Sequence, residues 1–133
     1  MLNNEEISNA CKVNIPANND FAVVARMMLC GACAIYNMDI DVIEDLKIAS
    51  DEAICCLLNQ PGMASSIDIT AENTKAGIIV EFMALSASIT QTREKSDVDL
   101  TRAILETLIP KVNICSDDRG VFCITFFFPN NEE

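Results

Sequence analysis

The sequence has no histidine and only four glycines among its 133 residues. Without an imidazole, the chain cannot form the Ser-His or Cys-His pair that activates many enzymatic nucleophiles. It contains neither a Walker-type phosphate loop nor a dinucleotide-binding fingerprint. Four glycines are also few for a loop that must bring its backbone close to a phosphate. These absences argue against the commonest hydrolase and nucleotide-binding chemistries.

Basic residues are scarce as well. Nine lysines and arginines stand against 20 aspartates and glutamates, which gives a formal net charge of -11. A chain with so few cations releases few counterions from nucleic acid, so we expect no direct nucleic-acid binding. The acidic surface either serves solubility or favours a basic protein partner.

Long apolar runs are missing, and the chain begins with the polar, acidic stretch MLNNEEISNA. No run approaches the roughly 20 residues of a spanning helix, and this start does not resemble a signal peptide. We therefore expect a cytoplasmic protein without a membrane span. Its seven cysteines, an odd number scattered through apolar stretches, favour free and buried thiols over a disulfide framework.

What the sequence does contain is a regular succession of periodic segments. The hydrophobic periods and turn residues predict the order β-α-α-β-β-α-β-β. This order predicts an α+β two-layer sandwich, a mixed or antiparallel sheet with helices on one face. We expect a loose acidic segment over residues 1–9, a single domain over 10–129 and an acidic tail over 130–133. The predicted strands are 11–15, 65–71, 75–85, 111–116 and 120–128, and the predicted helices are 21–39, 41–60 and 99–109.

In two of these segments, the first helix and the closing strand, the apolar residues bear on how much of the segment is buried. The first helix is apolar along two stripes, one through Phe21, Val24, Met28, Ala32 and Ile35, which predicts that it is mostly buried. The closing strand, CITFFFP, is apolar at consecutive positions. It is either a central strand covered on both faces or a strand with one side open to a partner.

The second helix, DLKIASDEAICCLLNQ, and the closing stretch NICSDDRGVFCITFFF carry a family resemblance. The chain resembles the small anti-sigma serine kinases of bacterial partner-switching systems. These belong to the GHKL, or Bergerat-fold, ATPases, the superfamily of histidine-kinase catalytic domains. The resemblance implies the Bergerat fold, Mg-ATP as cofactor, a sigma factor or an anti-sigma antagonist as partner, and a homodimer formed near the first strand.

The nucleotide motifs of that family are altered here. In its Glu-x-x-x-Asn helix, the glutamate is a candidate base and the asparagine binds Mg²⁺. Glu52 matches the glutamate, whereas Cys56 replaces the asparagine with a soft thiol. In its Asp-x-Gly-x-Gly motif, Ala84 replaces the aspartate that reads adenine. Ser86 and Ser88 replace the glycines.

The third motif is a glycine-rich lid whose backbone N–H groups hold the phosphates. Asp97 and Asp99 stand at the two glycine positions of this Gly-x-Gly-Leu motif. Two like charges about 4 Å apart repel by about 4 kcal/mol at an effective dielectric near 20. All three motifs are therefore changed in the direction that weakens nucleotide binding.

The sequence supports three hypotheses. The first is an anti-sigma or partner-switching regulator that binds proteins and has lost ATP, in which Glu52 is a vestigial base or an ordinary carboxylate at the rim of a groove. The second is an active ATP-dependent serine kinase with unusual nucleotide contacts, in which Glu52 is the base and Mg-ATP is the cofactor. The third is a thiol or zinc sensor. Under the first, we expect no cofactor and no metal.

The third hypothesis depends on four cysteines. Cys30 and Cys33 form a C-x-x-C late in the first helix, where the helix dipole does not lower a thiol pKa. Cys55 and Cys56 on the second helix are the other candidate zinc ligands, but adjacent helical residues diverge by about 100°. Packing of these cysteines in the core, zinc binding and redox sensing all stay open.

Overall fold

The computed structural model describes residues 9–86 and 98–130, and it has the element order that the sequence predicts. A single turn of 3-10 helix, Asn19–Phe21, precedes the first α-helix. The predicted segment 1–9 and tail 130–133 lie outside the described ranges except for residues 9 and 130. The elements are β1 (Ala10–Pro16), α1 (Ala22–Ile35), α2 (Ile40–Leu58), β2 (Ala64–Asn73), β3 (Gly77–Ser86), α3 (Val98–Leu108), β4 (Lys111–Asp117) and β5 (Gly120–Pro129).

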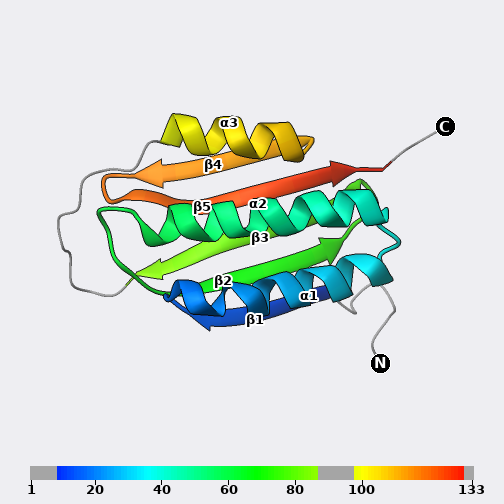
Figure 1. Cartoon of the computed structure of the whole chain (residues 1–133), viewed down its shortest axis with the longest axis horizontal. Helices are drawn as coiled ribbons and strands as arrows, with labels where there is room; N and C mark the ends of the chain where they lie inside the picture. The colour runs from blue at the N-terminus through cyan, green and yellow to red at the C-terminus, as the bar shows by residue number, and fades with distance from the viewer. Residues whose placement is uncertain (1–8, 87–97, 131–133) are drawn as a thin grey trace, which may run out of the picture.

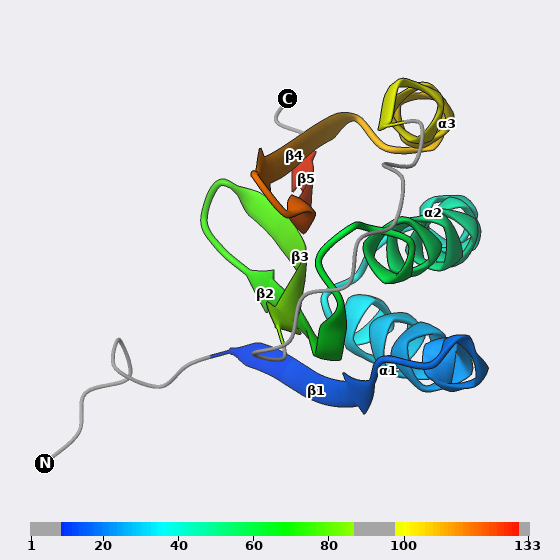
Figure 2. The ribbon, with the colours of Figure 1, turned by 90° about the vertical axis from the view of Figure 1, so that its left-hand side faces the viewer.

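The five strands form one sheet in the order β1-β2-β3-β5-β4. Every neighbouring pair is antiparallel, so of the two predicted alternatives the antiparallel sheet is confirmed. Figures 1 and 2 show that α1, α2 and α3 lie side by side on the same face of the sheet. The predicted two-layer α+β architecture is therefore confirmed.

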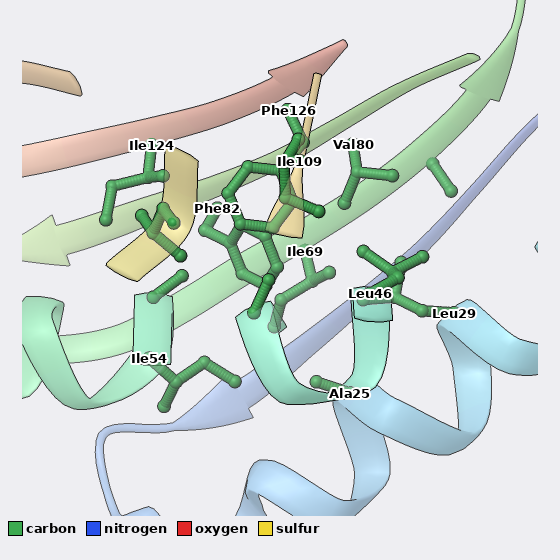
Figure 3. Packing of buried hydrophobic residues seen from close by; sticks show 14 of the residues in the cluster. Ala25, Leu29, Leu46, Ile54, Ile69, Val80, Phe82, Ile109, Ile124 and Phe126 are labelled. Atoms are coloured by element: carbon green, nitrogen blue, oxygen red, sulfur yellow. The ribbon is translucent and has the colours of Figure 1, made fainter. Parts of the chain in front are cut away.

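The core lies between the sheet and α2. Phe82 of β3 and Phe126 of β5 meet edge to face, with ring centroids 5.2 Å apart and an interplanar angle of 61°. Leu46 and Ile54 of α2 belong to the same core cluster and lie on the helix side of these rings (Figure 3). The inward face predicted for α2 is confirmed, because all six of its residues are buried: Ile43, Leu46, Ala49, Ala53, Cys56 and Leu57.

The prediction that the first helix is mostly buried is wrong. Only Ala32 of the stripe that begins at Phe21 is buried, while Met27 and Ile35 are 69% and 77% exposed. The face of α1 that meets the core is made mainly of alanines, which let the helix approach β1 and β2 closely. Leu29 is the one large side chain of α1 that is buried, whereas Val23, Val24, Met27 and Ile35 are exposed. Despite these apolar residues, none of the helices within 9–86 and 98–130 is long and apolar enough to cross a bilayer.

The closing strand is an interior strand of the sheet, but helices cover it on one face only (Figure 2). β5 lies between β3 and β4, and Phe126 and Phe128 turn toward the helices. Phe127 lies on the opposite face, where the Lys111 ammonium sits 5.8 Å from its ring centroid. The interpretation as a strand covered on both faces is therefore wrong, and the second face of β5 is only partly covered by side chains of its own sheet.

Candidate functional site

Glu52, the predicted base, lies on the side of α2 that faces α3. It is half-buried, and the Thr101 hydroxyl donates a hydrogen bond of 3.2 Å to its Oε2. The carboxylate forms one wall of an open cleft of about 500 Å³ between the three helices, which we call the helix-layer cleft. Its lining consists of Asn19, Asp20, Ala22, Val23, Arg26, Ile48, Asp51, Glu52, Cys55 and Ile104.

The charges of the helix-layer cleft are unbalanced. Three carboxylates line it and Arg26 is the one cation among its lining residues. Arg26 is already engaged, because its Nε lies 3.2 Å from Oδ1 of Asp51 across the α1–α2 boundary. Glu52 forms no ion pair with any residue in the described part of the chain. The cleft therefore keeps a net negative charge.

Cys56 follows Glu52 by one helical turn but does not line the same cleft. Its side chain is only 4% exposed, and Nε2 of Gln60 lies 3.6 Å from its Sγ. Burial raises the pKa of this thiol, and the nearby Glu52 carboxylate raises it further. A buried, neutral thiol is a poor ligand for Mg²⁺, which binds hard oxygen atoms.

Ala84, predicted at the adenine-reading position, lies in a different place from Glu52. It is half-buried near the end of β3, opposite Ile67 of β2. The cavity beside it measures about 20 Å³, which is room for about one water molecule. A site for a drug-sized ligand usually needs at least about 300 Å³. The cavity that the described residues form beside Ala84 is therefore too small for an adenine ring.

None of the remaining predicted positions within residues 9–86 and 98–130 belongs to the lining of the helix-layer cleft. Ser86 is the last residue of β3, where its backbone pairs with that of Ala64. Asp99 is exposed in the first turn of α3. Ser88 and Asp97 lie outside the described residues. Glu52 and Ala84 therefore line separate openings, and only the one at Glu52 is large.

Sequence reasoning missed Gln60, which closes the end of the molecule near Ala84. This side chain is 2% exposed and links the C-terminus of α2 to β5. Its Nε2 donates to the Cys56 carbonyl at 2.8 Å, and its Oε1 accepts from the Val121 N–H at 2.9 Å. No sequence pattern could have found this role, because a polar residue before Pro61-Gly62 reads only as the end of a helix.

The comparisons with known proteins concern architecture. No family model and no curated protein matches the sequence. The crystal structure of the RsbU and RsbW domains of Rv1364c from Mycobacterium tuberculosis is similar over 88% of this chain, with a TM-score of 0.66 and 17% sequence identity. This chain has an RsbW-like fold. It spans 31% of the length of that protein's chain, and at 17% identity the likeness establishes the fold alone.

The four cysteines of the sensor hypothesis differ in burial. Cys33 and Cys56 are buried, Cys30 is half-buried and Cys55 is exposed, all as free thiols. Within residues 9–86 and 98–130, no three side chains of His, Cys, Asp or Glu gather in a way that could hold a metal ion. Burial, with smaller contributions from Cys30 and Cys11, raises the pKa of Cys33 from 9.0 to about 12. Cys33 is therefore a neutral core residue rather than a reactive thiolate.

We expect the stability of the fold to fall in alkaline solution. Burial raises the pKa of Cys33 to about 12 and that of Cys123 to about 11, and the Glu81 carboxylate contributes at Cys123. Unfolded thiols ionise near pH 9, so the unfolded state binds fewer protons than the native state above that pH. The free energy of unfolding should therefore be highest below pH 9 and decrease as the pH rises toward 11–12.

Denaturant titrations at pH 8 and pH 10 measure this effect, and Cys33→Ala is the control variant. Its free energy of unfolding should change less between the two pH values than that of the parent. In native protein at pH 8, Ellman's reagent should react quickly with the exposed Cys11 and Cys55 and only after unfolding with Cys33. Rapid reaction of all thiols in the native state would show that the core is open to solvent.

Proposed function

We infer that this chain is a regulator of the anti-sigma or partner-switching type that acts by binding another protein and has lost ATP binding and serine kinase activity. The observation that carries the proposal is the closed end of the sheet, where the cavity beside Ala84 measures about 20 Å³. Cys56 stands where the kinases that the chain resembles have their magnesium-binding asparagine. It is buried, and its Sγ accepts a hydrogen bond from Nε2 of Gln60. As the described residues form them, the first place offers no cavity of nucleotide size and the second offers no oxygen ligand for magnesium.

The fold supports the regulatory part of the proposal. RsbW is an anti-sigma factor serine kinase of the GHKL type, and a sigma factor or an anti-sigma antagonist is accordingly the partner we propose. The outer surface of α1 supports binding of a protein, since Met27 and Ile35 are largely exposed. The proposal includes a cytoplasmic location and a homodimer formed near β1, an edge strand of the sheet.

One observation favours the alternative of an active kinase. Glu52 lies on the wall of the helix-layer cleft, which is open and has a volume of about 500 Å³. A carboxylate in such a place is accessible to a serine hydroxyl, as a general base must be. In that case, Mg-ATP would have to bind through residues other than those at the three altered motif positions.

Titration with Mg-ATP separates the two functions. We expect no heat of binding in calorimetry and no change in melting temperature at millimolar Mg-ATP. A ligand present at 100 times its Kd would stabilise the native state by about 2.7 kcal/mol, which a thermal melt detects readily. A titration with magnesium alone is the control. Micromolar binding of Mg-ATP, or phosphate transfer that Glu52→Gln abolishes, would establish the kinase instead.

A further inference from the structure

Exposed apolar side chains surround the helix-layer cleft. Val23 of α1 is 44% exposed and Ile48 of α2 is 57% exposed, and both belong to its lining. Met27 lies one helical turn after Val23 and is 69% exposed. Residues four apart share one face of a helix, so Met27 extends the apolar surface along α1. Leu100, 59% exposed, does the same on α3 one turn before Ile104 of the lining.

The surface next to these apolar residues is acidic. Asp20, Asp51 and Glu52 line the cleft, and its single cation, Arg26, is paired with Asp51. Nearer the start of α2, the exposed Glu44 forms an ion pair with Lys47, whose Nζ lies 3.2 Å from its Oε2. Arg26 and Lys47 are thus both engaged by acids of the same chain. A cation from outside would meet Asp20 and Glu52, and neither forms an ion pair in the described ranges.

We propose that the helix-layer cleft binds a cationic side chain, an arginine or a lysine, from an amphipathic segment of a partner protein. The apolar residues of that segment cover Val23 and Ile48, and its cation enters between Asp20 and Glu52. The volume of about 500 Å³ falls within the range of pockets that enclose a ligand group. Apolar anchors beside opposite charges are the usual way in which a groove recognises a helix.

The negative charge of the chain favours a cationic partner over a second copy of the chain, a phosphate or a nucleic acid. A second copy of the chain would bring acids against acids, since the net charge of -11 is repeated in every copy. A phosphate or a nucleic acid would be repelled for the same reason. The proposal rests on the function inferred above, in that it assumes action through protein contacts, but it involves no nucleotide.

The test uses two synthetic peptides of about 15 residues that form amphipathic helices. One carries leucine on one face and arginine on the other, and the second has glutamate in place of every arginine. Fluorescence anisotropy with the full chain should show binding of the arginine peptide, weakened by salt, and no binding of the glutamate peptide. Ile48→Ser and Glu52→Gln should each weaken binding by at least about fivefold.

Two control variants make the same substitutions, isoleucine to serine and glutamate to glutamine, at positions outside the cleft. Ile40→Ser changes an isoleucine that is 74% exposed at the start of α2, and Glu106→Gln neutralises an exposed acid of α3 outside the cleft. Both should bind the arginine peptide within about twofold of the parent. Because Cys55 lines the cleft and is exposed, saturating arginine peptide should slow its alkylation. Alkylation of Cys11, which lies outside the lining, should keep its rate.

Three results would overturn the proposal: no binding of the arginine peptide, equal loss of binding in cleft and matched variants, or equal protection of Cys11 and Cys55. The second and third would mean that the peptide senses only the overall charge. These failures are distinguishable from failure of the proposed function, which is decided by the Mg-ATP titration without any peptide. Peptide binding with the expected residues would hold whether or not a nucleotide also binds.

Discussion

Replacing Gln60 with alanine is expected to lower the free energy of unfolding by about 2–4 kcal/mol. The buried amide of Gln60 is the acceptor for the Val121 N–H and a donor to the Cys56 carbonyl. Its loss leaves the buried N–H of Val121 without this partner, which costs about 1–3 kcal/mol. The cavity left by the missing side chain adds to this cost. Urea denaturation of the two proteins at neutral pH measures the difference.

Asn59→Ala is the matched control, because the neighbouring amide makes a similar hydrogen bond in a different environment. Asn59 is exposed, and its Nδ2 donates to the Cys55 carbonyl at 2.8 Å. Water replaces such a bond, so this variant should stay within about 0.5 kcal/mol of the parent. Equal losses in Gln60→Ala and Asn59→Ala would show that burial does not set the value of the Gln60 bonds.

Gly120→Ala is expected to cost about 3 kcal/mol, for two physical reasons that act together. Gly120 has a φ of 106°, a conformation that residues with a Cβ rarely adopt. A Cβ at this position would also lie 2.4 Å from Oε1 of Gln60 and 2.9 Å from Cδ of Pro61. The alanine side chain would therefore push the turn between β4 and β5 away from the end of α2. Thermal and urea denaturation measure the loss.

The control for Gly120→Ala is Gly31→Ala on the outer face of α1. A Cβ at Gly31 would meet nothing within 4 Å. Alanine is the better helix former, so this variant should be more stable by up to about 1 kcal/mol. Equal destabilisation of the two variants would contradict the geometric reason given for Gly120.

The Gln60→Ala/Gly120→Ala double variant tests whether the two residues form one unit. The alanine at position 60 removes the atom that the new Cβ would meet, although the contact with Pro61 and the positive φ remain. The cost of the double variant should therefore fall below the sum of the single costs by about 1 kcal/mol. Additive costs would mean that the contact between Gln60 and Gly120 contributes little.

The Gln60 unit also bears on function, because it holds the end of α2 against β5 beside the cavity at Ala84. The backbone adds a further link, since Gly62 N–H donates to the Arg119 carbonyl at 2.8 Å. A substitution of Ala84 by aspartate would restore an adenine-reading group without creating space for the base. Ala84→Asp alone should therefore not produce measurable binding of Mg-ATP in the calorimetric titration.

The sequence by itself determined the order of the elements and the inward face of α2. Hydrophobic period and turn residues are local properties, and α2 packs against the centre of the sheet, where periodicity and burial coincide. Through a resemblance, the sequence also predicted the matching position Glu52 and the altered positions Cys56 and Ala84. The comparison of folds supports that resemblance at the level of architecture.

Only the tertiary structure decided which side of α1 is buried, where Gln60 binds, and that Glu52 and Ala84 line separate openings. For α1, apolar residues occur all round the helix, so the choice of face depended on how closely alanines let it approach β1 and β2. For Gln60, the deciding partner is Val121, 61 residues away in the chain. Burial and hydrogen bonding between distant segments depend on the packed arrangement, and no local pattern encodes them.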